Sequence, residues 1–183
     1  MLLTKLINHL DMYFNKIYKK KPKFNKLRFS YQKEKNMGNI NAFNHSVTVV
    51  AYEKENKKYA ATIAWAMQVD YDKVLLLMGS QSVTGKNIMK GDLIGVSTLS
   101  RNQKEIADFI GDTHSDEVNK FENISYKEEN GVILINNAAR LMKVKVIDIL
   151  HLEGIEEDNL IYGEVIEIVN NNNDFLNYDV YLK

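Results

Sequence analysis

The chain has 183 residues, 45% of them hydrophobic and 26% charged, with 24 basic and 24 acidic side chains and no cysteine. These values are typical of a globular domain large enough to bury its own core. The absence of cysteine excludes disulfides, thiolate catalysis and Cys-based metal sites. No window is apolar enough to predict a membrane span, so we expect a soluble, cytoplasmic protein.

Residues 1–40 are predicted to form a basic, amphipathic arm. Residues 1–35 carry ten Lys or Arg but two Asp or Glu, and apolar side chains recur at helical spacing from Leu3 to Ile17. "KKKPK" breaks this helix at Pro22, the only proline. We favour a packed helix or interface arm over a nucleic-acid arm, because no stacking aromatics are interleaved in a binding motif.

From about residue 45 the apolar pattern changes to that of short strands. "HSVTVVAYE" (45–53) and "YAATIAWAMQV" (59–69) predict a hairpin across "KENKK". "KVLLLMG" (73–79) predicts a strand covered on both faces. The chain then favours a short helix in "GKNIMKGD" (85–92), a strand in "LIGVSTLS" (93–100) and a helix in "NQKEIADFIGD" (102–112).

The rest of the chain completes a mainly β domain. Residues 132–154 predict a broken strand pair, and "NLIYGEVIEIVN" (159–170) alternates as a closing strand. Roughly six strands with few, short helices predict a small antiparallel barrel over residues 41–170. "NNNND" predicts a turn or loose linker, so we expect residues 171–183 to form a C-terminal tail.

Catalytic and metal-binding motifs are not found. The four histidines show no HExxH or similar spacing, and "GSQSVTG" lacks the Lys-Ser/Thr ending of a phosphate-binding P-loop. "THSDE" (113–117) places a histidine beside two carboxylates but is typical of a solvated loop. We therefore assign no catalytic residue and no metal ligand.

Residues 59–88 offer the parts that a flavin mononucleotide needs. Small side chains, among them Ala61 and Ala64, would let a flat ring approach the strand closely. Hydroxyls precede a helix start near Gly85, and Lys86 adds a positive charge, which together suit a phosphate. The same hydroxyls are also ordinary helix caps, so these residues alone leave ligand binding and capping both open.

The stretch from about residue 45 to 168 resembles the flavin reductase-like, FMN-binding split-barrel family, which includes flavoredoxins. "ATIAW" (61–65) stands where the family has its Thr-x-Ser/Ala-Trp element, and "TGKNI" (84–88) reproduces its Thr-x-x-x-Ile spacing. Later landmarks match in the same order: "GDLIGVSTLSRNQKEIADFIG" (91–111), "VNKF" (118–121) and "IYGEVIEI" (161–168).

The resemblance implies an FMN-binding homodimer with a Greek-key split barrel and ring sites near the subunit interface. It implies that Trp65 either lines the ring or lies in the barrel core beside it. The implied cofactor-binding residues are Thr62, Ile63, Ala64 and Trp65 for the ring, and Ser80, Gln81, Ser82, Thr84 and Lys86 for the phosphate, with Ser97 where the family commonly has Asn.

Two positions depart from the family pattern. Many of its reductases carry an Asp-His pair shortly before the Gly-Glu-Val strand, a plausible nicotinamide contact, whereas this chain has Asp158 and Asn159. Val83 stands where a basic residue often precedes the family's Thr. The first departure weakens the interpretation as an NAD(P)H reductase, and the second weakens the phosphate assignment slightly.

Three hypotheses follow from the residues and the resemblance. The leading one is an FMN-dependent oxidoreductase that takes hydride from NAD(P)H, in which the cofactor performs the hard chemistry. The second is a flavoredoxin-like electron carrier that binds FMN and uses protein partners. The third is a domain of the same fold that has lost flavin and acts as an interaction module.

Overall fold

The computed structural model describes residues 43–182. The chain divides into two units, Met1–Ile40 and Asn41–Lys183. The predicted basic arm lies outside the described residues and stays a prediction. All of the following concerns the second unit.

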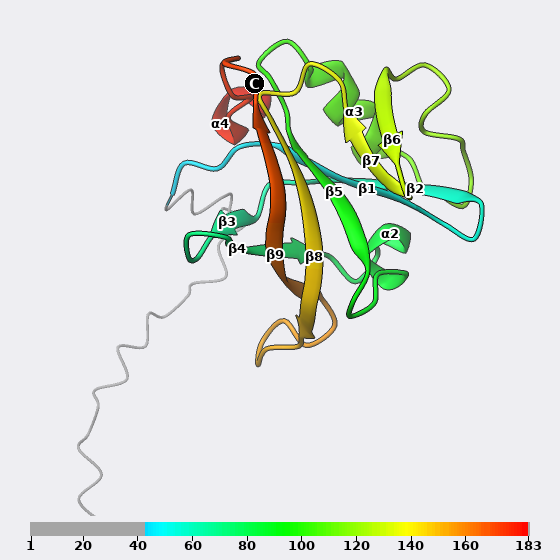
Figure 1. Cartoon of the computed structure of the whole chain (residues 1–183), viewed down its shortest axis with the longest axis vertical. Helices are drawn as coiled ribbons and strands as arrows, with labels where there is room; N and C mark the ends of the chain where they lie inside the picture. Colours follow the sequence, from blue (N-terminus) through cyan, green and yellow to red (C-terminus); the bar gives the residue numbers. More distant parts are fainter. Residues whose placement is uncertain (1–42, 183) are drawn as a thin grey trace, which may run out of the picture. The chain divides into compact units, whose positions relative to one another are not determined.

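The described chain is mainly β, as the sequence predicts, and its strands form one sheet (Figure 1). The sheet order is β3-β4-β9-β8-β5-β1-β7-β6, and β2 pairs with β1 beside this path. The strands are β1 (Thr48–Lys54), β2 (Lys57–Ile63), β3 (Ala66–Gln68), β4 (Lys73–Met78), β5 (Leu93–Thr98), β6 (Tyr126–Glu129), β7 (Val132–Ile135), β8 (Arg140–Leu150) and β9 (Asn159–Asn170).

The predicted hairpin is confirmed in β1 and β2. They pair antiparallel from Thr48↔Ile63 to Lys54↔Lys57. Glu55 and Asn56 connect them with φ angles of 55° and 61°, as a two-residue turn of type I′ requires of both its central residues.

The second predicted strand, 59–69, is two strands in the structure. β2 ends at Ile63, and β3 begins at Ala66 and pairs with β4 instead of β1. The carbonyl of Trp65 accepts a hydrogen bond from Leu77 N at 2.9 Å, so the pairing with the β4 side has already begun there. The chain therefore changes partners at Ala64 and Trp65, and these two residues lie on a bend.

Three helices are described: α2 (Val83–Lys86), α3 (Lys104–Asp112) and α4 (Tyr178–Tyr181). α3 confirms the predicted second helix and buries Ala107 and Ile110. α2 begins two residues earlier than predicted, because Ser82 caps it by accepting a hydrogen bond from Gly85 N at 3.1 Å.

The C-terminal segment packs on the domain where the sequence predicts a tail. Leu176 is buried in the core, and its N–H donates to Leu99 O at 2.9 Å. Its carbonyl accepts from Val47 N at 2.8 Å. These bonds connect the segment to the residues next to β1 and β5. α4 lies next to α3, where Lys104 Nζ is 4.5 Å from the centre of the Tyr181 ring (Figure 1).

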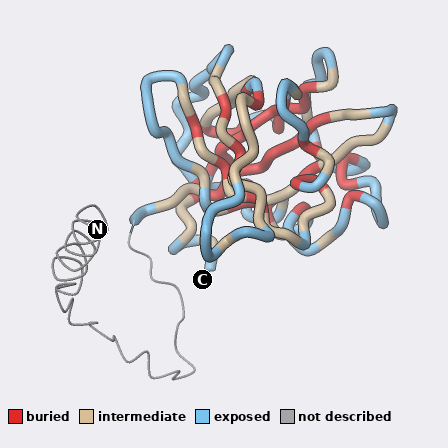
Figure 2. The backbone as a smooth tube through the Cα atoms, turned by 90° about the horizontal axis from the view of Figure 1, so that it is seen from below, coloured by how far each residue is buried: buried red, intermediate tan, exposed pale blue. Residues whose placement is uncertain are grey.

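The core has two clusters of buried side chains. One lies between β1, β7, α3 and the C-terminal segment, and the other lies between β4, β5, β8 and β9. Buried segments fall in the middle of the strands, and the exposed ones lie in the connecting loops (Figure 2). β1 contributes to both clusters through alternating side chains such as Val49 and Val50, so its two faces are covered.

Candidate functional site

Two adjoining cavities contain most of the residues that the sequence analysis selects. The Trp65 cavity, of about 290 Å³, is lined by Thr62 near the end of β2 and by Trp65 in the bend that follows. The Lys120 cavity, of about 100 Å³, lies on the other side of Thr62 and contains Lys120. Thr62, Gln81 and Gly111 line both, so the two cavities share a wall.

The Trp65 cavity has aromatic and apolar walls. Its predicted lining residues are Thr62, Ile63, Ala64, Trp65 and Gln81, and α3 and α4 add Gly111, Asp112, Tyr178 and Tyr181. The Trp65 side chain is 59% exposed, which excludes the core position considered for it. The bend between β2 and β3 turns this indole outward, and a flat ring could stack there.

Tyr178 and Tyr181 close one side of the Trp65 cavity. Their rings stack with centroids 6.2 Å apart. Burial, followed by a hydrogen bond to Asp108, raises the pKa of Tyr181 to about 12, so its phenol is protonated at neutral pH. Sequence analysis missed both residues because it assigned this segment to a tail.

The Lys120 cavity is polar and holds a buried cation. Lys120 is 4% exposed, and its Nζ donates to Ala60 O at 2.9 Å and to Ile110 O at 2.7 Å. Burial lowers the pKa of this ammonium to about 8, with a smaller opposing effect from Asp116. The other polar lining residues are Thr62, Gln81, Ser82, Thr84, Thr113, His114 and Ser115.

Thr84 lines the Lys120 cavity, but its hydroxyl donates its hydrogen to a backbone carbonyl and not to a ligand. The side chain is 2% exposed, and Oγ1 donates to Ala60 O at 2.9 Å. Its Oγ1 also lies 3.4 Å from Ser115 Oγ. Thr84 therefore connects α2 to β2, and its oxygen can at most accept a further hydrogen bond from a ligand.

Asp158 and Asn159, which stand where many family reductases have an Asp-His pair, bond to α2 and to the loop before it. Asp158 Oδ1 accepts from Ser80 N at 2.8 Å. Asn159 Nδ2 donates to Gly85 O at 3.0 Å. The start of β9 and the residue before it thus position residues 80–85. Ser80 lines neither of the two cavities.

Two predicted ligand residues lie away from both cavities. Lys86 is the last residue of α2, and its side chain is exposed to solvent and lines neither cavity. Ser97 is 1% exposed inside β5, and its Oγ accepts from Ile135 N at 3.0 Å, which connects β5 to β7. The sequence interpretation of Lys86 and Ser97 as parts of one site is therefore not supported by their positions.

Lys120 is the functional candidate that sequence analysis left unassigned. The "VNKF" stretch resembles a family landmark, but no charge pattern connects residue 120 to a loop about 40 residues earlier in the chain. The connection comes from α3, whose last turn accepts a hydrogen bond from Lys120.

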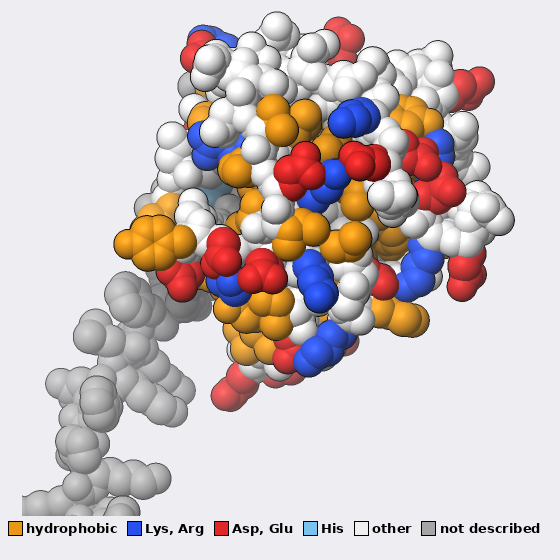
Figure 3. All heavy atoms as spheres, in the orientation of Figure 1, with side chains coloured by type: hydrophobic (Ala, Val, Ile, Leu, Met, Phe, Trp, Pro, Cys, Tyr) orange, Lys and Arg blue, Asp and Glu red, His pale blue; other side chains and the backbone are white. Residues whose placement is uncertain are grey.

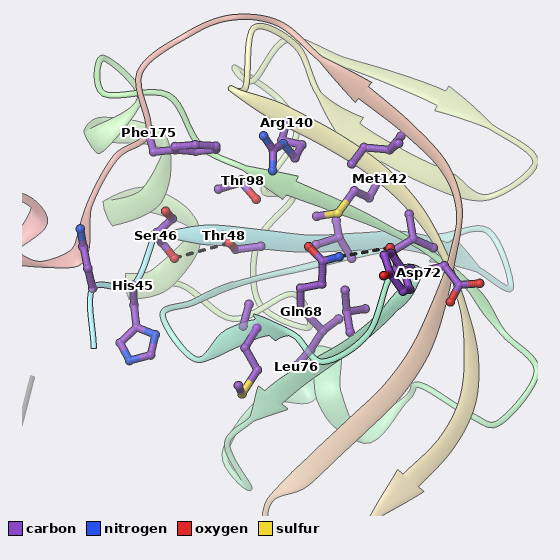
Figure 4. Close-up of a pocket in the computed structure, with 18 residues that line it drawn as sticks. His45, Ser46, Thr48, Gln68, Asp72, Leu76, Thr98, Arg140, Met142 and Phe175 are labelled. Atoms are coloured by element: carbon purple, nitrogen blue, oxygen red, sulfur yellow. Dashed lines mark hydrogen bonds between the residues drawn. The ribbon is translucent and has the colours of Figure 1, made fainter. Parts of the chain in front are cut away.

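A larger cavity, of about 480 Å³, lies beside the β3–β4 hairpin (Figure 4). Arg140 lines it, and its guanidinium lies 5.2 Å from the Phe175 ring. Arg140 Nε is buried without a hydrogen-bond partner. None of the residues selected by sequence lines this cavity, so it is separate from the candidate flavin site.

Within residues 43–182, no three His, Asp or Glu side chains are grouped in a way that could hold a metal ion. In the same range, the helices are all too short or too polar to cross a membrane.

Comparison with known proteins defines the class of this protein. Residues 40–181 match the sequence model of the family described as "Flavin reductase like domain". The chain belongs to this flavin reductase-like family. A search of curated proteins gives no match.

Solved structures share its fold, which is that of the split barrels of this family. NADH:FAD oxidoreductase SgcE6 of Streptomyces globisporus has 21% identity and a TM-score of 0.65, over 73% of this chain and 80% of that one. The flavin reductase PheA2 has 22% identity and a TM-score of 0.63, over 74% and 85%. A flavoredoxin from Methanosarcina acetivorans has 15% identity and a TM-score of 0.63, over 73% and 74%.

Proposed function

We propose that this protein binds FMN in the Trp65 and Lys120 cavities and passes reducing equivalents from NAD(P)H to an acceptor. The observation that carries the proposal is that the aromatic Trp65 cavity lies next to the polar Lys120 cavity, which contains a cation. The two share Thr62, Gln81 and Gly111 as lining residues. Their volumes of about 290 and 100 Å³ together fall at the low end of ligand pockets, about 300–1,000 Å³.

The residues of this chain fit FMN in character as well as in size. A flavin supplies hydride and electron transfer when it is bound, so the protein needs to bind and orient it. Trp65 and the two tyrosines of α4 offer aromatic surfaces for the ring. Thr62 Oγ1 donates to Ala107 O at 2.9 Å, which fixes the strand end along which the ring would lie.

A second candidate is a flavoredoxin-like electron carrier that uses a protein partner instead of NAD(P)H. The observation that favours it is that the side chains of Asp158 and Asn159 make structural hydrogen bonds within the protein. Asp158 bonds to Ser80 in the loop before α2 and Asn159 bonds to Gly85 in α2, and neither position is a histidine. The third candidate, a flavin-less interaction domain, would leave the buried charge of Lys120 without a ligand.

We also propose that the protein works as a homodimer in the cytoplasm. Apolar side chains are exposed on β3 and β9, and exposed apolar surface of this kind marks interaction sites. Figure 3 shows such side chains among charged ones on the face that carries β8 and β9. Two-fold dimers are the commonest closed assembly.

The deciding experiment is the visible spectrum of the purified protein, followed by anaerobic addition of NADH and of NADPH. Bound flavin gives a yellow protein, or quenching of added FMN fluorescence at micromolar protein. Bleaching by either nucleotide supports the reductase, and a yellow protein that bleaches only with dithionite supports the carrier. A protein that neither is yellow nor quenches FMN refutes flavin binding.

A further inference from the structure

Lys120 occupies an unusual position for a lysine. It lies in the loop between α3 and β6, and its ammonium is enclosed by backbone carbonyls at the end of α3 and in β2. Ala60 O accepts from Lys120, from Thr84 Oγ1 at 2.9 Å and from Ser115 Oγ at 3.2 Å. A carbonyl oxygen shared by three donors compensates little of a full positive charge.

The charged groups around Lys120 leave this cation unpaired. Within the described chain, no carboxylate lies within 4.0 Å of its Nζ. Asp116 acts on it through space, and His114 lines the same cavity. Asp112 at the end of α3 lines the neighbouring Trp65 cavity. β2 and residues 81–84 line the Lys120 cavity with uncharged side chains only.

A buried, unpaired ammonium costs free energy, which an anionic ligand would recover. Among the hydroxyls of its walls, those of Thr84 and Ser115 donate to Ala60 O. Ser82 Oγ accepts from Gly85 N, so its hydrogen is left to donate to a phosphate. Lys86, the cation selected from the sequence, is exposed and lines neither cavity.

From this geometry we propose that Lys120 binds the phosphate on the ribityl chain of the flavin, from the inner wall of its cavity. The inference rests on the proposed function, because it places the ring in the Trp65 cavity and the phosphate across Thr62. Lys120, in the loop after α3, would then supply the positive charge for the phosphate. Val83 has no charge, and Lys86 lines neither cavity.

The proposal has a consequence for pH. Burial keeps the pKa of Lys120 at about 8. A phosphate beside the ammonium favours its charged form and raises this pKa, so phosphate binding above pH 8 requires uptake of a proton. The affinity for FMN should therefore decrease between about pH 8 and pH 10, whereas the affinity for riboflavin, which has no phosphate, should change little.

The test compares FMN, FAD and riboflavin by fluorescence quenching at pH 7, with wild type, Lys120→Met, Lys120→Arg and Lys86→Met. In Lys120→Met, FMN affinity should fall about 10- to 100-fold, because a charge-assisted hydrogen bond to the phosphate is lost. Riboflavin affinity should change less than about threefold. Lys120→Arg should keep most of the FMN affinity, and Lys86→Met should keep all of it.

FAD shows which phosphate the cavity accepts. If Lys120→Met loses as much affinity for FAD as for FMN, the cavity binds the ribityl phosphate that both flavins share. If its FAD affinity is unchanged, the cavity accepts this phosphate only where it is terminal, as in FMN.

Equal losses of FMN and riboflavin affinity in folded Lys120→Met would overturn the proposal. Lys120 would then act only by connecting β2 to the end of α3 through its hydrogen bonds. Should Lys120→Met fail to fold, the wild-type pH profile decides, and equal profiles for the two flavins refute the proposal. If wild type binds neither flavin, the proposed function itself is refuted, and that result differs from any outcome in which wild type binds both.

Discussion

Ala60 is the residue on which the candidate site converges. Its N–H donates to Ser115 Oγ at 3.1 Å, and its carbonyl accepts from Lys120, Thr84 and Ser115. The residue itself is fully buried. The backbone of one residue in β2 therefore holds the loop after α3 and the helix α2 in place at the same time.

At this scale, the structure changes the expectation for Thr84. Thr84→Val keeps the shape of the side chain but removes its hydrogen bond to Ala60 O, while two other donors continue to satisfy that oxygen. We expect the free energy of unfolding to fall by about 1 kcal/mol, with equal, small changes in FMN and riboflavin affinity. Urea unfolding and flavin titration measure both.

Thr113→Val is the matched control for Thr84. Its hydroxyl donates to Phe109 O at 2.6 Å in an exposed position, so the loss of stability should stay below about 0.5 kcal/mol. A selective loss of FMN affinity in Thr84→Val would show instead that Thr84 binds the phosphate.

Lys120 also predicts a pH dependence of stability. Its pKa is about 8 in the folded protein against an ordinary value of 10.5. Between these values the unfolded chain binds a proton that the folded one has released, so stability should rise with pH, by about 3 kcal/mol when the whole window is crossed. Below pH 8 both states are protonated and this contribution is flat.

Urea unfolding of wild type and Lys120→Met at intervals from pH 7 to pH 10 measures this effect. The stability of the variant should lack this rise with pH, because methionine has no proton to release. Tyr181, with a pKa of about 12 in the folded protein and an ordinary value of 10.0, lowers the stability toward pH 10 equally in both proteins, so its effect cancels in the comparison. Parallel pH curves for the two proteins would contradict the prediction.

Among the elements, β5 shows how closely the strands pack. Gly95 pairs with Ala51 of β1 and Lys143 of β8, and a Cβ added to it would overlap the carbonyl of Ile133 in β7. Three strands therefore meet at a position that has no room for a side chain. This close approach brings β7 against the core of the sheet.

Gly95→Ala should destabilise the fold by about 3 kcal/mol or more, because backbone atoms must move to admit the methyl group. Gly111→Ala in α3 is the control. Its Cβ would meet Thr62 Cβ at 3.6 Å, an ordinary contact, and alanine favours a helix, so we expect a change within about 1 kcal/mol. Thermal or urea unfolding measures the stability of both variants. Equal losses of stability would contradict the claim that only Gly95 lacks room for a methyl group.

For the molecule as a whole, the exposed apolar side chains of β3 and β9 predict self-association. Met67 and Ile168 are 58% and 50% exposed, and both line the 480 Å³ cavity beside the β3–β4 hairpin. We expect the wild-type protein to have twice the mass of one chain in light scattering. Ile168→Lys should give the monomer mass, because a charge in an apolar interface loses its solvation.

Glu153→Lys, a charge change at an exposed position in the β8–β9 connection, is the control and should remain dimeric. A wild-type protein that is monomeric at working concentration with FMN present would contradict the dimer.

The sequence alone determined the strands whose pattern is strong. β9 begins and ends at the predicted residues 159 and 170, and the β1–β2 hairpin has the predicted turn. The apolar alternation of these segments is a local property, so it can be detected without knowing the partners. β6, with the sequence "YKEE", was missed because an exposed edge strand has no apolar alternation. The family also followed from the order of short motifs, as its match over residues 40–181 confirms.

Only the tertiary structure decided which polar side chains meet. Ser97 and Lys86 are near candidate residues in sequence, yet one faces β7 and the other faces solvent. Lys120 is distant in sequence from Ala60, yet it bonds to it, because α3 and its following loop fold back over β2. The physical reason is that a strand or helix period fixes the direction of a side chain relative to its own element. Its neighbours depend on how separate elements pair and pack, and short local patterns carry no information about that.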